Sequence, residues 1–122
     1  MKKLTRKEEE LMKILWKIKE GFVKDIAEHY SEPIPHYNTI SSLVRLLEEK
    51  GYVDHKAYGN THHYFPIVTK QEYRKSFIKD VVKDYFDNSY KQTVSLFIEE
   101  KELSNDDLDE LIDLIKSKKE EK

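Results

Sequence analysis

The chain has 122 residues, with 22 Lys and Arg against 24 Asp and Glu, so its formal net charge is −2. It has no Cys, which excludes disulfides, thiolate metal sites and a Cys nucleophile. No apolar run approaches the roughly 20 residues of a membrane span, and the charged start leads into no apolar signal segment. We therefore expect a cytoplasmic protein without membrane insertion. The near-neutral charge disfavours a protein that coats nucleic acid indiscriminately, because such binding needs an excess of cations.

Three short helices are predicted in the first half of the chain. They are expected over residues 6–20, 23–30 and 36–50. Thr5 and Glu8 form a capping box before the first helix, whose apolar residues repeat at the spacing of one buried stripe. Gly21 and Gly51 are expected to end the first and third helices, and Pro33 interrupts the chain after the second.

Two segments rich in β-branched and aromatic residues follow, over residues 52–58 and 61–68. Gly59-Asn60 separates them, which predicts a hairpin with a tight two-residue turn. Helix, helix, helix and hairpin is the order of a winged helix-turn-helix, in which the third helix enters the major groove of DNA. The predicted fold is mainly α with a small β-hairpin, and residues 1–68 form a winged-helix DNA-binding domain.

Residues 69–122 are expected to be almost purely helical, beginning with the capping box Thr69–Glu72. Helices are predicted over 70–86 and 90–101, with a last one after residue 104. Their apolar side chains are too many for a solvent surface, which favours a helical dimerisation domain. The alternative is that this part folds back onto its own winged helix. The residues predicted to form the dimer interface are Tyr73, Phe77, Val81, Tyr85, Val94, Phe97, Leu108, Leu111, Ile112 and Ile115.

The third predicted helix carries short polar side chains and one cation on its exposed face. Short side chains let the backbone approach base edges, while Asn can read adenine and Arg can read guanine. The candidate DNA contacts on this helix are Tyr37, Asn38, Thr39, Ser41, Ser42 and Arg45. The alternative is that Asn38 and Thr39 only cap the helix and that the serines are ordinary surface residues.

The hairpin tip carries groups that commonly bind phosphate. The candidate contacts there are Lys56, Asn60, Thr61 and His62, and the alternative is a hairpin that only meets solvent. Adjacent His62 and His63 should point to opposite faces of a strand, so no metal site is expected, and no cofactor. The sequence contains no Gly-rich phosphate loop, HExxH motif or nucleophile elbow, so we do not expect an enzyme.

The sequence resembles the BlaI/MecI/CopY family of bacterial transcriptional repressors, also called penicillinase repressors. The resemblance covers about residues 4–118. The matching stretches are Glu10–Trp16, Tyr37–Ile40, Arg45–Val53, Tyr64–Pro66 and the Leu-Ser-x-x-Asp-Leu motif at 103–108. This family combines a winged helix with a helical dimerisation region, and its members bind operator DNA as homodimers.

The resemblance implies a repressor that controls β-lactam resistance or related stress genes. In the penicillinase branch, a membrane sensor with a metalloprotease domain triggers cleavage of the repressor at an Asn-Phe bond. That bond aligns with Leu96-Phe97, where the Phe matches and the Asn does not. The copper branch uses C-terminal cysteines, which this chain lacks. A rival from another class is a winged-helix module that binds a protein instead of operator DNA.

Overall fold

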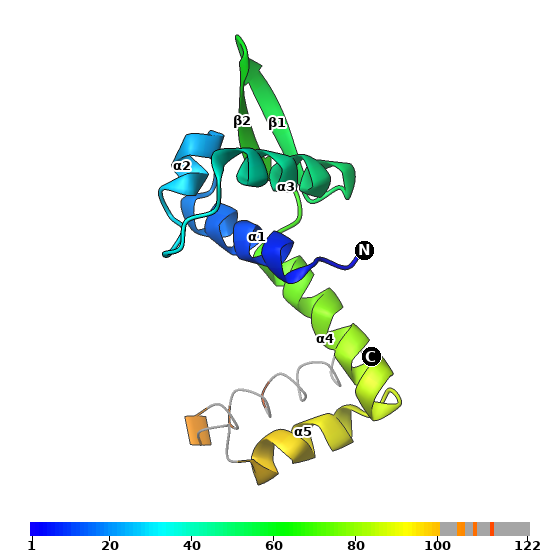
Figure 1. Ribbon diagram of the computed structural model, residues 1–122. Coiled ribbons are helices and arrows are strands. Elements are labelled where there is room, and N and C mark those ends of the chain that lie inside the picture. Colours follow the sequence, from blue (N-terminus) through cyan, green and yellow to red (C-terminus); the bar gives the residue numbers. More distant parts are fainter. Residues whose placement is uncertain (101–104, 107–108, 110–112, 114–122) are drawn as a thin grey trace. The chain divides into compact units, whose positions relative to one another are not determined.

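The computed structural model describes residues 1–100, 105–106, 109 and 113 (Figure 1). The chain divides into two compact units, Met1–Ser76 and Phe77–Lys122. The helices and strands, in chain order, are α1 (Arg6–Ile18), α2 (Val23–Ala27), α3 (Tyr37–Glu49), β1 (Val53–Tyr58), β2 (Thr61–Pro66), α4 (Lys70–Phe86) and α5 (Tyr90–Glu99). This order confirms the winged-helix prediction of a mainly helical chain with one hairpin. The predicted helix after residue 104 falls mostly outside the described residues.

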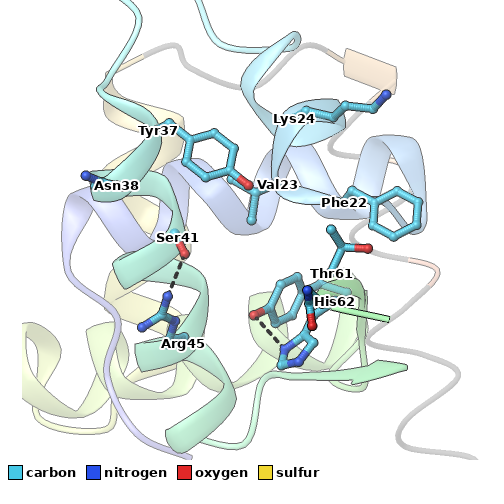
Figure 2. A pocket seen from close by; sticks show the side chains of 11 residues that line it. Phe22, Val23, Lys24, Tyr37, Asn38, Ser41, Arg45, Thr61 and His62 are labelled. Atoms are coloured by element: carbon cyan, nitrogen blue, oxygen red, sulfur yellow. Dashed lines mark hydrogen bonds between the residues drawn. The ribbon is translucent and has the colours of Figure 1, made fainter. Parts of the chain in front are cut away.

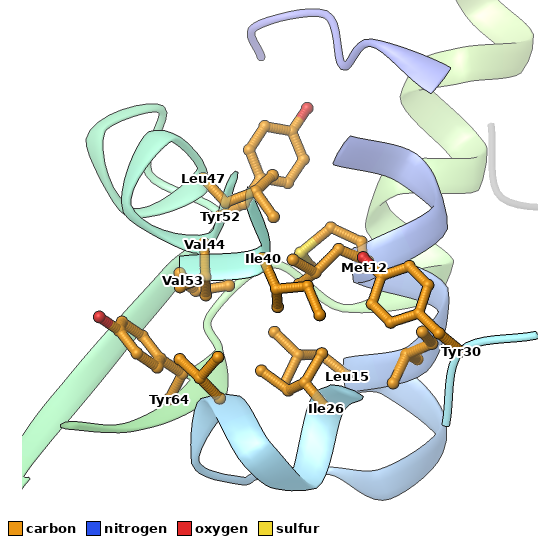
Figure 3. Packing of buried hydrophobic residues seen from close by; sticks show 13 residues of the cluster. Met12, Leu15, Ile26, Tyr30, Ile40, Val44, Leu47, Tyr52, Val53 and Tyr64 are labelled. Atoms are coloured by element: carbon orange, nitrogen blue, oxygen red, sulfur yellow. The ribbon is translucent and has the colours of Figure 1, made fainter. Parts of the chain in front are cut away.

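The core of the first unit lies where α1, α2 and α3 meet the hairpin (Figure 3). Each helix buries one apolar stripe, represented by Leu15 of α1, Ile26 of α2 and Ile40 of α3, all fully buried. Tyr64 of β2 and Val53 of β1 close the core from the hairpin side. Packing of these stripes fixes α3 against α2 and leaves its polar side free for a ligand.

The end of α1 differs from the prediction. The helix stops at Ile18, because Lys19 adopts a left-handed conformation with φ of 76°. Gly21 is not a helix cap but a buried partner of β2, and its backbone exchanges hydrogen bonds of 2.9 and 2.8 Å with Tyr64. A Cβ at position 21 would lie 3.0 Å from the Cβ of Asp25. Glycine therefore permits a close approach of backbone to helix. The second helix is also shorter than predicted and ends at Ala27.

The base of the first unit is held by a buried ion pair. Glu8 is only 2% exposed, and its Oε1 lies 2.6 Å from Lys50 Nζ. The same oxygen accepts the backbone N–H of Thr5 at 2.8 Å, while Thr5 Oγ1 accepts that of Glu8 at 3.2 Å. The predicted capping box is thus confirmed. Lys50 also donates to the backbone carbonyl of Lys3, which joins the chain start to the end of α3.

The first turns of α4 belong to the first unit and pack on α1. Trp16 Nε1 donates to the Val68 carbonyl at 2.9 Å, and the Trp16 ring lies 5.5 Å from that of Tyr73. Tyr73 donates its hydroxyl to Glu9 at 2.6 Å, and this hydrogen bond lowers the pKa of Glu9. The side chain of Tyr73 thus packs within its own chain, and its role at the dimer interface stays a prediction. The division into two functional domains at Val68 stays a prediction.

The second unit buries little apolar surface among its described residues. Val82 and Thr93 are buried there, although neither was predicted to be. Phe77, Tyr85 and Phe97, predicted for the dimer interface, are exposed, Tyr85 by 78%. The remaining predicted residues of α4 and α5, Val81 and Val94, are half-buried. The other four, Leu108, Leu111, Ile112 and Ile115, lie outside the described residues.

Within the described part of the chain, no helix is long and apolar enough to cross a membrane.

Candidate nucleic-acid interface

A hollow of about 590 Å³ lies between α2, α3 and the hairpin (Figure 2). It brings together most of the residues predicted to contact DNA, from two elements that are separate in sequence. Its lining consists of Phe22, Val23, Lys24, Tyr37, Asn38, Ser41, Arg45, Asn60, Thr61, His62 and Tyr64. The start of α3 and the tip of the hairpin therefore share one concave surface.

The polar side of α3 is ordered before any ligand arrives. His36 caps the helix, and its Nδ1 accepts the backbone N–H of Asn38 at 3.1 Å. One turn further on, Arg45 Nη2 donates to Ser41 Oγ at 3.0 Å, so the guanidinium lies along the helix (Figure 2). A planar guanidinium suits bidentate recognition of a guanine edge or a phosphate. This arrangement reduces the side-chain entropy that binding would otherwise cost.

The hairpin register assigns the residues near the tip to the two faces of the sheet. β1 and β2 are antiparallel, with Ala57 opposite His62 and Lys56 opposite His63. Opposed residues share a face of the sheet, so His62 and Lys56 lie on opposite faces. Thr61 and His62 line the hollow, and the Thr61 hydroxyl donates to the Tyr58 carbonyl at 2.9 Å. The expectation that the adjacent histidines point apart is confirmed.

Three predicted contacts lie outside this hollow. Lys56 is exposed on the other face of the hairpin, and Ser42 is exposed on α3. Thr39 lines a second hollow of about 540 Å³, beside the 31–35 segment. Tyr30 lines it too, and its buried hydroxyl has no partner among the described residues. Burial raises the pKa of Tyr30 to about 12. These positions therefore do not act through the same concave surface as Arg45.

Sequence reasoning missed one side of the hollow, the start of α2. Lys24 is the exposed cation of that helix, and it could have been found on the polar side of the predicted second helix. Phe22 gave no comparable signal, because its role depends on a distant strand: its ring lies 4.7 Å from that of His63 and 5.9 Å from that of Tyr58. The buried ring of Tyr64 also lines the hollow.

The charge around the hollow differs from the charge of the whole chain. Its lining includes Lys24 and Arg45, and no Asp or Glu is among the lining residues. Burial raises the pKa of Tyr64, which Arg45 opposes, so the phenol stays neutral beside the guanidinium. Two cations with neutral polar groups form a surface that attracts an anion.

The described residues with metal-ligand potential lie beside this surface. Glu48, Asp54 and His55 each place one ligand atom within 4.8 Å of the others. Hydrogen bonds within the group already use these atoms, since His55 Nδ1 lies 2.7 Å from Glu48 Oε1 and the His55 N–H donates to Asp54 Oδ1 at 2.7 Å. This geometry explains the cluster without an ion.

Comparison with known proteins agrees with this geometry. The family model described as penicillinase repressor matches residues 4–117. The methicillin resistance regulatory proteins MecI of Staphylococcus aureus (strain N315), Staphylococcus epidermidis and Mammaliicoccus sciuri are each 24% identical over 116 residues, which is 94% of either chain. The match extends over both compact units. The chain therefore belongs to the penicillinase repressor family of DNA-binding regulators.

Proposed function

We propose that the chain binds operator DNA as a homodimer and represses genes for β-lactam resistance or a related stress response. The observation that carries this proposal is the hollow between α2, α3 and the hairpin, with its two cations and no acidic lining residue. The family membership supports a repressor, and the curated relatives are named as regulators of methicillin resistance. The cations and amide groups of this hollow favour DNA over the protein-binding alternative, although aromatic side chains such as Phe22 and Tyr37 also line it.

The roles of individual residues follow from their chemistry. Asn38 and Arg45 are our candidates for reading bases in the major groove. An amide can form two hydrogen bonds with adenine, and a guanidinium can form two with guanine. Lys24, Asn60 and Thr61 are our candidates for phosphate contacts, which set register without reading sequence. Tyr37 and Ser41 border the same hollow, and Ser41 also orients Arg45. Under this proposal, Thr39, Ser42 and Lys56 make contacts outside the hollow.

Replacing Arg45 should weaken specific binding. We expect Arg45→Ala to cost about 1–3 kcal/mol on a selected operator duplex if the guanidinium reads a base, with much less effect on a scrambled duplex. The matched control is Lys24→Ala, which should weaken both duplexes alike and reduce the salt slope by about 1. Fluorescence anisotropy with both duplexes at two salt concentrations measures the affinity of each variant and its salt dependence. Equal affinity of wild type for both duplexes would contradict operator recognition, and unchanged binding by Arg45→Ala would remove Arg45 as a contact.

A homodimer follows from the exposed apolar side chains of α4 and α5. Phe77, Tyr85 and Phe97 are large and exposed, and a second copy would remove them from water. A twofold dimer also presents two recognition helices to half-sites about one helical turn, ~34 Å, apart or a multiple of it. We therefore place the dimer interface on the second unit.

Cleavage by a partner sensor protease is the proposed route of induction. Leu96 and Phe97 lie within α5, and both side chains are exposed. A cut between them would remove everything from Phe97 onward and should separate the dimer. We expect a chain of residues 1–96 to sediment as a monomer and to lose tight operator binding. A stable dimer of this truncated chain with full operator affinity would contradict the mechanism.

A further inference from the structure

One side of the hairpin carries a row of aromatic rings that leads from the hollow to α3. His55 lies opposite Tyr64 in the strand register, and His62 lies opposite Ala57, so His55 and His62 are diagonal neighbours on one face. Their rings stack in parallel, with centroids 4.0 Å apart and planes 8° apart. His62 Nδ1 also lies 3.5 Å from the Tyr64 hydroxyl. The His62 ring that lines the hollow is therefore held on two sides.

The other end of this row is tied to α3. Glu48 lies one turn after Arg45 on the helix, and its Oε1 is 2.7 Å from His55 Nδ1. Both side chains are partly buried, with exposed fractions of 28% for His55 and 34% for Glu48. A short contact of this kind, partly shielded from water, is stronger than an exposed ion pair. Glu48 thus connects the helix that carries Arg45 to the strand that carries His55.

The charged side chains around His55 also affect the electrostatic potential of the proposed DNA-binding surface. Glu48 faces it from α3, Asp54 faces it from its own strand, and Arg45 is the nearby cation that acts on Tyr64. Two carboxylates beside a DNA-binding face repel phosphate. Their hydrogen bonds to the ring and backbone N–H of His55 hold them in place without removing their charge, and His62, stacked on His55, lines the hollow.

A two-stranded hairpin needs such support, because it is marginally stable alone in water. The backbone pairing of Gly21 with Tyr64 anchors β2 to the segment after α1. His55 lies opposite Tyr64 on β1, so the Glu48–His55 contact of 2.7 Å ties the other strand to α3 at the same level of the hairpin. The angle between the hairpin and α3 decides whether Thr61 and Arg45 can reach the same duplex together.

We infer that Glu48 and His55 are positioning residues for DNA binding: they fix the hairpin against α3, and the His55 ring holds His62 in the hollow. This inference rests on the proposed operator binding and adds to it two residues that need not touch DNA. Helix and hairpin then bind as one preformed unit, so the cost of ordering the hairpin does not reduce affinity.

The test uses the full chain and the operator duplex that the wild-type protein selects from a random pool. Single phosphates are replaced in turn by neutral methylphosphonates, which identifies the phosphates that the hairpin contacts. We expect His55→Ala to weaken binding to the unmodified duplex about 3- to 10-fold, the scale of one net hydrogen bond. Where a hairpin phosphate is already neutral, the loss should shrink toward none, because that contact is already absent.

Two conservative variants separate the parts of the arrangement. His55→Asn keeps a hydrogen-bond donor for Glu48 and removes the stacked ring, whereas His55→Phe keeps a flat ring and removes the donor. His55→Asn and His55→Phe should each recover part of the operator affinity that His55→Ala loses. An unchanged midpoint of thermal unfolding shows that the variants fold. Wild-type affinity in His55→Ala, or an equal loss on every modified duplex, would overturn the positioning role alone. A wild-type chain that binds no duplex would overturn the proposed function as well.

Discussion

A chain with Tyr85→Glu and Phe97→Glu together should sediment as a monomer and bind its operator about 100- to 10,000-fold more weakly than wild type. Both side chains are large and exposed on the second unit, where we place the dimer interface. In a dimer, the second recognition helix binds its half-site at high effective concentration once the first is bound. A monomer loses that gain although its hollow, formed entirely by the first unit, is intact.

The added negative charge requires a matched control, since it alone weakens DNA binding. Gln92→Glu with Ser95→Glu adds the same charge at exposed polar positions of α5. This control should remain a dimer and lose little operator affinity. Sedimentation velocity and fluorescence anisotropy on the three proteins give the comparison. A dimeric Tyr85→Glu, Phe97→Glu chain, or a monomeric wild type with full affinity, would contradict the proposed dimer.

Local sequence signals predicted the elements of the fold because the contacts that define them join residues close together in the sequence. The capping box of Thr5 and Glu8 joins residues three apart, and Gly59 supplies the positive φ of the hairpin turn. Gly21 was misread because its function depends on Tyr64, 43 residues away. The contacts of Tyr73 with Trp16 and Glu9 on α1 could not be predicted for the same reason.

The candidate site was predictable on α3 and only in part elsewhere. The buried stripe of that helix determines its polar side, so Asn38, Ser41 and Arg45 could be identified from periodicity. Phe22 and Lys24 belong to the hollow through the packing of α2 against the hairpin, which no local pattern specifies. The position of His55 beside Glu48 likewise depends on how the hairpin packs on α3. The turn sequence predicts the hairpin but does not predict this packing.

Replacing the buried carboxylate of Glu8 should lower the folding stability of the first unit. We expect Glu8→Gln to lower the free energy of unfolding by about 2–3 kcal/mol at neutral pH, because Lys50 then loses its charged partner in a largely buried site. Measurement is by urea unfolding at several pH values. The matched control is Glu10→Gln, an exposed position of the same helix, which should change stability by about 0.5 kcal/mol or less.

The pH dependence of this effect has a definite sign. Burial raises the pKa of Glu8, but the hydrogen bonds from Lys50 and Thr5 outweigh it and hold the pKa below 4.5. A carboxyl whose pKa is lowered by folding stabilises the protein fully above its unfolded value and loses that contribution as the pH falls through the folded value. The gap between wild type and Glu8→Gln should therefore be constant near neutral pH and narrow below about pH 4.5. A gap that stays constant into acid would mean that the charge of Glu8 does not stabilise the junction of the chain start, α1 and the end of α3.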